Sequence, residues 1–372
     1  MTVSASVADL CVDPGQRALP WLTDLYGPFA TPIRTHAIVA VIQRLHSMLR
    51  STAIRGRLAV VGGWRRRRLE QLSAQQRAPI TVLFYHRVAD EYPNPWTIGV
   101  AEFEAQLDYC RTEFEVIGLD EVQRRLSTRR SPRPAVAITF DDGYADNFRY
   151  ALPALIRHRI PCTYFVSTGH IRSGKPFAHD VEYGQPLPVN TIEEVQAIAN
   201  CGIDIGLHTA DHFDFSRSCT REDLRRQITD AKRELESWLD DQPVRYFAVP
   251  YGMPRQMRTA VFAAARRCGL QGVCSAYGAY NQVGEDPFHI KRVHGDPDQI
   301  RLRNWLSYDP RKARRAPSIP LDEVGSEGAD SEFASGLALS PPDRTRPSTS
   351  KPPLPACDSP PGGSVSPSTP TA

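Results

Sequence analysis

A short apolar run that ends in two aspartates constrains this chain more than any other stretch. Residues 135–140 (AVAITF) are apolar or β-prone throughout, and Asp141, Asp142 and Gly143 follow at once. Such a run is typical of a strand buried on both faces, as in parallel sheets. Parallel α/β folds keep their chemistry at the carboxyl ends of these strands. Alone, the aspartates also fit an ordinary strand-to-helix turn, so a functional interpretation needs a second stretch.

Strand-like and helix-like segments alternate along the chain on both sides of this run. Further strands are predicted at 80–88, 162–167, 203–207, 246–249, 272–276 and 288–293. Helices are predicted at 101–113, 119–126, 144–158, 191–200, 221–239, 257–268 and 300–306. The alternation predicts an α/β fold with a parallel barrel or a wound sheet.

A second strand end carries two histidines. The predicted strand at 203–207 runs directly into His208, and His212 follows in the motif HTADH. This spacing lets one helical turn or one tight loop aim both imidazoles at one point, although the pattern alone has many false matches. Because parallel strands end on one face of such a fold, we expect both histidines beside Asp142. One aspartate and two histidines with an open fourth position form the ligand set of a catalytic Zn²⁺.

A third strand end reads FAVPYG, residues 247–252. The structural interpretation is a Pro-Tyr-Gly turn. The functional interpretation uses the backbone N–H of Tyr251 as a hydrogen-bond donor to a developing oxyanion, because backbone donors are fixed in advance. The Tyr251 ring, next to Pro250, is then a wall that faces a sugar.

Composition excludes several classes of function. The chain has 45 Lys and Arg against 42 Asp and Glu, and this net charge of +3 is too near balance for nucleic acid as the main partner. None of the 8 cysteines forms a CxxC pair, so no cysteine zinc site or redox motif is indicated. No secretory signal and no membrane-spanning run is recognised. We therefore expect a protein of the cytoplasm or of the inner membrane surface.

The chain divides into three regions that differ in amino-acid composition. We expect a partly helical, basic extension over 1–78, a folded domain over 79–309 and a disordered Pro/Ser-rich tail over 310–372. Within the extension, a predicted helix at 36–49 precedes Trp64 and a run of arginines. This segment either contacts an anionic membrane face or is a solvated basic helix docked on the main domain, and we favour the second interpretation.

The motifs TFDDGYADN, HTADH and PYG, in this order, resemble those of NodB-like polysaccharide deacetylases, carbohydrate esterase family 4. The resemblance covers about residues 80–306, and FYHRV near the domain start is similar to the opening strand of one branch of that family. It implies a distorted (β/α)7 barrel with a divalent metal, usually zinc, with Co²⁺ or Ni²⁺ as alternatives. It also implies the hydrolysis of acetyl groups, mostly N-acetyl, from sugars.

Carried over to this sequence, the resemblance implies that Asp142, His208 and His212 bind the metal. It implies that Asp141 is the general base and that the backbone of Tyr251 is the oxyanion donor. The metal is expected to polarise the acetyl carbonyl and to acidify water, and Asp141 is expected to take the water's proton.

The third motif departs from the family pattern. Many members carry an arginine two residues before its proline, where this chain has Ala248. Arg292, in HIKRVHGD, matches an arginine that other members carry late in the domain. We expect Arg292 to supply the missing charge to Asp141.

The general acid stays open, because the family's late Leu-x-x-His motif is absent as such. His294 is the first candidate, with Asp296 as its orienting partner, and His86 is the rival; a structural role is as compatible with either histidine. Further residues carry weaker expectations, as cleft residues (Tyr280, Asn281, Asp180) or as loop histidines (His170, His179).

These observations predict a metal-dependent hydrolase that removes acetyl groups from a polysaccharide, an oligosaccharide or a lipid-linked sugar. An exopolysaccharide, a chitooligosaccharide and peptidoglycan are all compatible substrates. The alternatives are a catalytically silent glycan-binding module and another metal hydrolase, an amidase or phosphodiesterase, on the same barrel. Asp141 argues against the binding module, which needs no base, and a two-metal phosphodiesterase would need more ligands.

Overall fold

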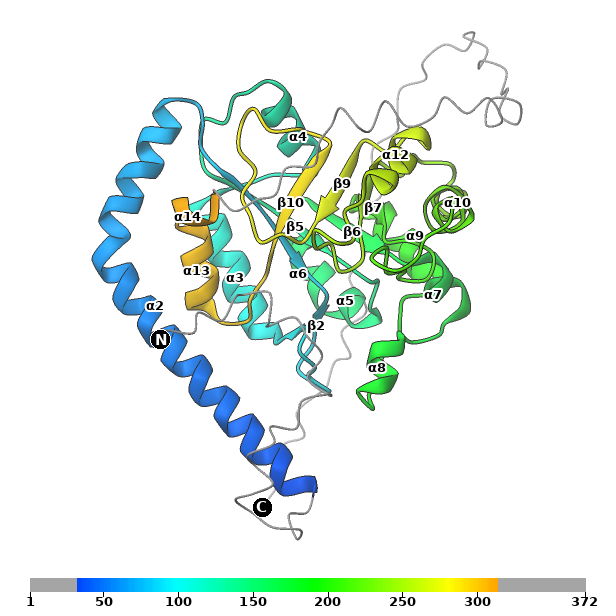
Figure 1. Cartoon of the computed structure of the whole chain (residues 1–372), viewed down its shortest axis with the longest axis horizontal. Helices are drawn as coiled ribbons and strands as arrows, with labels where there is room; N and C mark the ends of the chain where they lie inside the picture. The colour runs from blue at the N-terminus through cyan, green and yellow to red at the C-terminus, as the bar shows by residue number, and fades with distance from the viewer. Residues whose placement is uncertain (1–31, 314–372) are drawn as a thin grey trace, which may run out of the picture. The chain divides into compact units, whose positions relative to one another are not determined.

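Parallel strands close into a seven-stranded barrel in the computed structural model, which describes residues 32–313 and, within them, the side chains of 51–310, 312 and 313 (Figure 1). The strands are β1 (Ile80–Tyr85), β5 (Ala135–Phe140), β6 (Cys162–Val166), β7 (Asp204–Leu207), β8 (Tyr246–Ala248), β9 (Gly272–Ser275) and β10 (His289–His294). Neighbours follow chain order from β5 to β10, and β1 pairs with both β10 and β5. The predicted barrel is therefore confirmed, and the wound sheet is excluded.

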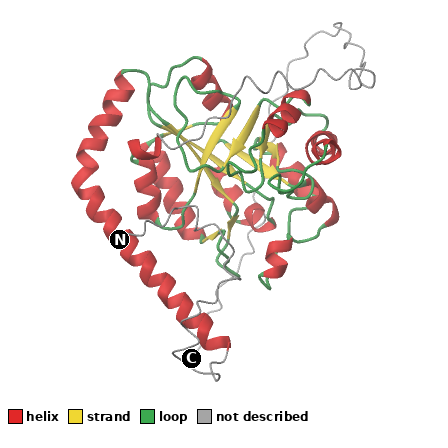
Figure 2. Ribbon diagram, in the orientation of Figure 1, coloured by secondary structure: helices red, strands yellow, loops and turns green. Residues whose placement is uncertain are grey.

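Helices and short strands fill the connections around the barrel (Figure 2). The helices that follow β1 are α3 (Val100–Glu113), α4 (Leu119–Ser127), α5 (Ala145–Arg149), α6 (Ala151–Arg157), α7 (Thr168–Ser173), α8 (Ala178–Glu182), α9 (Ile192–Asn200), α10 (Arg221–Leu224), α11 (Ala231–Trp238), α12 (Thr259–Arg267), α13 (Gln299–Leu306) and α14 (Pro310–Ala313). The short strands are β2 (Arg87–Val88), β3 (Thr97–Ile98) and β4 (Glu115–Val116).

Two predicted helices are interrupted. The helix expected at 144–158 is split into α5 and α6, and Pro153 lies in the first turn of α6, where its missing N–H is not needed. The helix expected at 221–239 contains a π-helical segment, η3 (Arg225–Asp230), between α10 and α11. π-Helical segments of this kind occur mostly as single turns inside α-helices.

The parity of the strands decides which side chains enter the barrel. Alternate residues of three strands belong to one core cluster: Ile80 and Val82, Ala135 and Ala137, and Ile290. Residues of the opposite parity, such as Leu83 and Val136, belong to the other core cluster, which the barrel shares with the helices. Successive side chains of a strand point to opposite faces. The same parity therefore directs His86, Asp141, Arg292 and His294 toward the interior at the carboxyl ends of their strands.

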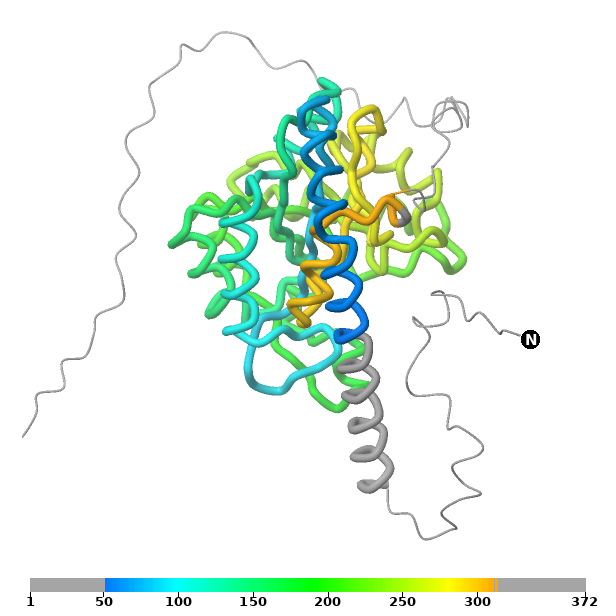
Figure 3. Tube along the Cα trace, turned by 90° about the vertical axis from the view of Figure 1, so that its left-hand side faces the viewer, coloured from blue at the N-terminus to red at the C-terminus, as the bar shows by residue number. Residues whose placement is uncertain are grey.

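The N-terminal extension contains one long helix, α2 (Pro32–Ala74), rather than the shorter predicted helix. The compact unit that contains the barrel begins at Gly62, so the end of α2 folds with the barrel. Buried Arg65 donates to Asn304 Oδ1 at 3.0 Å and to Asp309 Oδ2 at 3.0 Å, and Figure 3 shows this part of α2 beside α13. From Gly62 onward, the basic segment is thus docked on the main domain.

Two further expectations concern the chain ends. Among the described residues, no helix combines the length and the apolar character that crossing a membrane requires. The expected tail begins with the short helix α14, and the rest of it, residues 314–372, lies outside the described residues, as do residues 1–31.

Candidate active site

Asp142, His208 and His212 converge at the carboxyl ends of β5 and β7. Asp142 Oδ1 lies 3.3 Å from His208 Nε2 and 3.5 Å from His212 Nε2. Ligand atoms on a tetrahedral ion at about 2.0–2.2 Å are themselves about 3.4 Å apart, so these separations fit one divalent cation. Asp142 Oδ1 is also buried without a hydrogen-bond partner among the described residues, which is rare for a carboxylate oxygen unless it binds a cation.

Tight turns, and not a helix, present these groups. Asp142, His212 and Tyr251 have positive φ angles of 76°, 51° and 61°. Residues other than glycine rarely adopt this left-handed backbone, which persists only where the surrounding structure fixes it. Gly143, with φ 88°, completes the turn after β5. Several site residues thus hold strained backbone, a feature common at functional sites.

Ala248 orients one of the histidines. The Nδ1 atom of His208 lies 2.8 Å from the carbonyl oxygen of Ala248 at the end of β8. A carbonyl only accepts, so Nδ1 carries a proton, and Nε2, the atom that faces Asp142, is the one available to bind a metal. The position where many family members have an arginine therefore still contributes to the site, through its backbone.

Arg292 holds both oxygens of Asp141. Its guanidinium donates from Nη1 to Oδ1 at 2.6 Å and from Nη2 to Oδ2 at 2.8 Å, and both side chains are buried. It also donates to the Ser275 carbonyl and lies 4.8 Å from the centre of the Phe84 ring. Burial alone would raise the pKa of Asp141, but the charge and hydrogen bonds of Arg292, together with the nearby His208 and His86, hold this pKa below its ordinary value. Asp141 is therefore ionised beside Asp142.

His86 and His294 lie together against Phe84. Their ring centres are 5.9 Å apart, and each ring lies within 5.6 Å of the Phe84 ring. Burial lowers the pKa of His86, and it lowers the pKa of His294 to about 3. Both imidazoles are therefore neutral at physiological pH, and the Nδ1 of His86 has no hydrogen-bond partner among the described residues.

Asp296 does not orient His294 as expected. One of its carboxylate oxygens accepts from the backbone N–H of Asp298, and the other pairs with Arg301 at 3.4 Å. These contacts fix the loop after β10 and leave His294 to be positioned by the surrounding rings.

The structure contradicts the placement of Tyr280 and Asn281 in the cleft. Asn281 is fully buried and pairs with Ile80 at the amino end of β1, opposite to the site. The Tyr280 hydroxyl donates to the Trp305 carbonyl at 2.7 Å and accepts from the N–H of Asp309. Both polar side chains satisfy backbone groups at the closed end of the barrel, which explains their presence in a core.

The loop residues around His212 form a second polar cluster. Buried Asp180 accepts hydrogen bonds from the Tyr144 hydroxyl at 2.7 Å and from Asn94 at 3.2 Å. Burial raises the pKa of Asp180. His179, expected as a loop histidine, lies with its ring 5.7 Å from the His212 ring. Asp180 therefore joins three loops beside the site.

Two exposed aromatic side chains flank the site. The Tyr251 ring is 52% exposed and lies 5.0 Å from the His212 ring. The Trp96 ring is 46% exposed and lies 5.1 Å from the His86 ring. Sequence reasoning missed Trp96, because it lies in a loop with no periodic pattern; its neighbours Pro95 and Asn94, which mark a turn before a helix, were the available signal.

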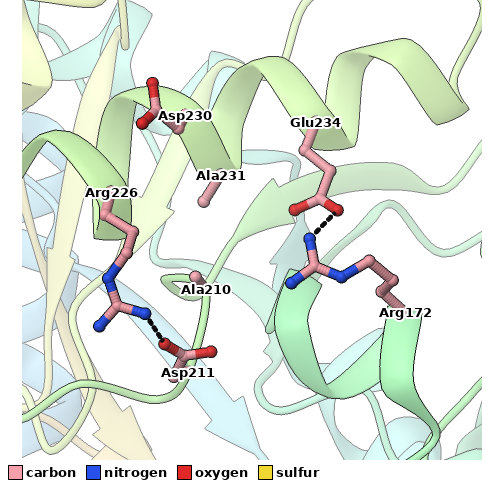
Figure 4. Close-up of a pocket in the computed structure, with 7 residues that line it drawn as sticks. All are labelled: Arg172, Ala210, Asp211, Arg226, Asp230, Ala231 and Glu234. Atoms are coloured by element: carbon pink, nitrogen blue, oxygen red, sulfur yellow. Dashed lines mark hydrogen bonds and ion pairs between the residues drawn. The ribbon is translucent and has the colours of Figure 1, made fainter.

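A polar pocket lies on the outer side of the HTADH loop, between α7 and the helix that ends in α11 (Figure 4). Ion pairs cross it, Arg172 to Glu234 at 2.5 Å and Arg226 to Asp211 at 2.6 Å. None of the expected site residues lines this pocket. The pair between Arg226 and Asp211 ties the loop that carries the two histidines to the neighbouring helix.

A parallel barrel that gathers an Asp/His/His cluster and an ionised aspartate at its strand ends defines a barrel hydrolase. Comparison with known proteins narrows this class: residues 128–273 match the family model described as polysaccharide deacetylase. IcaB from Ammonifex degensii has a solved structure that is 26% identical, with a TM-score of 0.52 over 62% of this chain and 97% of that one.

Two curated proteins are also similar. YxkH of Bacillus subtilis (strain 168), named as a polysaccharide deacetylase, is 24% identical over 61% of this chain and 75% of its own length. The chitooligosaccharide deacetylase of Sinorhizobium fredii (strain NBRC 101917 / NGR234) is 28% identical over 40% of this chain and 55% of its own length. The expected resemblance to polysaccharide deacetylases is therefore confirmed.

Proposed function

We propose that this protein is a metal-dependent deacetylase that removes N-linked acetyl groups from a glycan. The observation that carries the proposal is the cluster of Asp142, His208 and His212 with the ionised Asp141 beside it. Asp142 Oδ1 and the two Nε2 atoms would hold the ion, most plausibly Zn²⁺ given its preference for nitrogen and oxygen donors. A bound ion would polarise the acetyl carbonyl and acidify the attacking water.

The protein's own groups supply the remaining chemistry. Asp141 is the proposed base that takes the proton of the water, and the two hydrogen bonds from Arg292 keep its carboxylate in one orientation while leaving lone pairs for that proton. The backbone N–H of Tyr251, held in a fixed left-handed turn, is the proposed donor to the developing oxyanion. Ala248 keeps His208 in the tautomer that presents Nε2.

The leaving amine needs a proton, and His294 is the proposed donor, with His86 as the second candidate. The charge of Asp141 acts on His294, and the charges of Asp142 and Asp141 both act on His86. Because burial keeps both neutral in the resting protein, the donor would receive its proton during turnover, after Asp141 has taken one from water.

We propose an amino-sugar oligomer or polymer as the substrate class. The name of the rhizobial relative supports this proposal, because that protein acts on chitooligosaccharides. A lipid-linked sugar stays compatible, since Trp64 on α2 is 58% exposed and Arg66 and Arg67 beside it are exposed, as in segments that contact anionic membranes.

Acetate release from a small panel tests the proposal. The panel contains N-acetylglucosamine, its β-1,4- and β-1,6-linked tetramers, and 4-nitrophenyl acetate, each with chelator and with added Zn²⁺. We expect release from a tetramer that chelator stops and Zn²⁺ restores. Asp141→Asn should lower turnover about 10²–10⁴-fold and leave the metal content unchanged, whereas His212→Ala should lose metal.

The rival functions give different results. A glycan-binding module would bind the tetramers and release no acetate from any of them. An amidase would release acetate from a simple amide such as acetanilide, added to the panel, and not from the sugars. Unchanged turnover in Asp141→Asn would contradict the proposed base.

A further inference from the structure

Trp96 is a large apolar side chain that the fold holds half-exposed beside the site. It lies 5.1 Å from the His86 ring and, edge-on, 6.3 Å from the His294 ring. The residue is 46% exposed, so part of the indole is open to a ligand that packs on it. Trp96 thus contacts both histidines that the proposed mechanism considers as proton donors to the leaving amine.

The loop that carries Trp96 is built to hold one conformation. Buried Arg87 donates to the Tyr92 carbonyl at 2.8 Å and to Thr97 Oγ1 at 3.2 Å. Asn94 Oδ1 accepts from the backbone N–H of Trp96 at 3.0 Å and from the Thr97 hydroxyl. The backbone that carries the indole is therefore fixed before any ligand arrives, so less conformational entropy is lost on binding.

The same loop is tied to the turn that carries the proposed metal ligand. Asn94 Nδ2 donates to Asp180, and Asp180 accepts from the hydroxyl of Tyr144, which lies two residues after Asp142. Arg87 also pairs with Asp146 at 2.5 Å. Trp96 and the reacting groups thus belong to one connected framework.

We infer that Trp96 is a stacking platform for a pyranose ring of the substrate, on the side of the reacting amide that keeps the amine; this inference rests on the proposed function. The carbon-bound hydrogens of a pyranose form an apolar face that packs on an aromatic ring. The Tyr251 ring lies beside a different group of the site, the proposed metal ligand His212. The indole of Trp96 belongs to glycan recognition and not to the chemical step.

Two substrates separate binding from chemistry. The enzyme is assayed on the panel tetramer that wild type deacetylates faster, and on 4-nitrophenyl acetate, which has no sugar. Trp96→Ala should raise KM for the tetramer about tenfold, and Trp96→Phe should raise it less. Both variants should hydrolyse 4-nitrophenyl acetate as wild type does. Trp64→Ala removes another exposed indole, on α2, and should match wild type on both substrates.

A binding measurement gives an independent readout. Titrating Asp141→Asn with the tetramer should change its tryptophan fluorescence, and adding Trp96→Phe should remove most of that change. An unchanged KM in Trp96→Ala, or an equal loss on both substrates, which a role in packing His86 would produce, overturns the inference. Wild type that releases acetate from no sugar contradicts the proposed function, and this inference with it.

Discussion

The ion pair between Asp141 and Arg292 places two charges inside a barrel where side chains are otherwise largely apolar. Both residues lose their hydration, and the pair compensates through two short hydrogen bonds. Arg292 also lies over the Phe84 ring and donates to the Ser275 carbonyl. Such a pair contributes little net free energy to folding, but removing either partner leaves a buried unpaired charge, which destabilises the fold.

Removing only the arginine should therefore destabilise the fold. Arg292→Met leaves an unpaired carboxylate in the barrel, and we expect a loss of about 3–5 kcal/mol in the free energy of unfolding. The double variant Asp141→Asn/Arg292→Met has no buried charge and should be more stable than Arg292→Met alone. Urea denaturation of the metal-free proteins, followed by circular dichroism, measures both. Equal losses in the two variants would show that the charge is not the cause.

The proton donor can be identified through its leaving group. His294→Ala should lower kcat for an N-acetylated tetramer about 10²–10⁴-fold, because an amine cannot leave without a proton. Hydrolysis of 4-nitrophenyl acetate, whose leaving group needs no proton, should be retained. His86→Ala is the matched comparison in the same assay. If only His86→Ala shows this difference between the substrates, His86 is the donor.

Strand β7, which leads into His208, depends on a close approach between two neighbouring strands. A Cβ atom on Gly206 would lie 2.3 Å from the Phe165 ring of β6, which is buried in the barrel. Gly206→Ala should therefore cost about 1–3 kcal/mol of stability, measured as the urea midpoint.

Gly63 provides the matched control for that change. It lies in helix α2, and an added Cβ meets nothing within 4 Å. Gly63→Ala should stabilise the protein by up to about 1 kcal/mol, because alanine favours the helix. The same substitution is thus expected to have opposite signs at the two positions. Destabilisation of equal size at both would mean that the contact with Phe165 does not decide the effect.

Much of the barrel could be predicted because its strands are continuous apolar runs. The runs at 135–140 and 162–166 are β-prone and shorter than typical core helices, and the motif order indicated the family. The pairing of Arg292 with Asp141 was also expected, but on the resemblance alone. The parity along β1, β5 and β10 gives a physical reason for it that the separate stretches did not reveal.

The errors have local causes. Tyr280 and Asn281 look like cleft residues in sequence, because polar and aromatic side chains are typical of both binding sites and buried hydrogen-bond networks. Only the pairing of Asn281 with Ile80 shows which end of the barrel they occupy. Asp296 was assigned by proximity in sequence to His294, and proximity does not fix the direction of a side chain.

The end of helix α2 combines two properties on one segment. Arg65 is buried against α13, whereas Trp64, Arg66 and Arg67 are exposed. A helix anchored in this way can present an indole and two cations to another surface without leaving the domain. Contact with an anionic membrane, the other interpretation of this segment, is therefore compatible with the docked state.

Vesicle co-sedimentation tests that contact. Arg66→Glu/Arg67→Glu should weaken binding to phosphatidylglycerol-containing vesicles about tenfold or more, because each basic residue near an anionic surface is worth about 1 kcal/mol. Arg130→Glu/Arg133→Glu changes the net charge equally at exposed positions of the barrel domain and should bind as wild type does. Wild type that does not sediment with these vesicles, or equal weakening in both variants, would contradict the proposal.

Arg292 lies 151 positions after the aspartate that it holds. A chain emerging from the ribosome exposes the motifs with Asp142, His208 and His212 well before the final strand has been translated. Until β10 joins β1, the carboxylate of Asp141 has no guanidinium to fix it. Hydrolytic competence should thus appear only after β10 has been translated and has paired with β1.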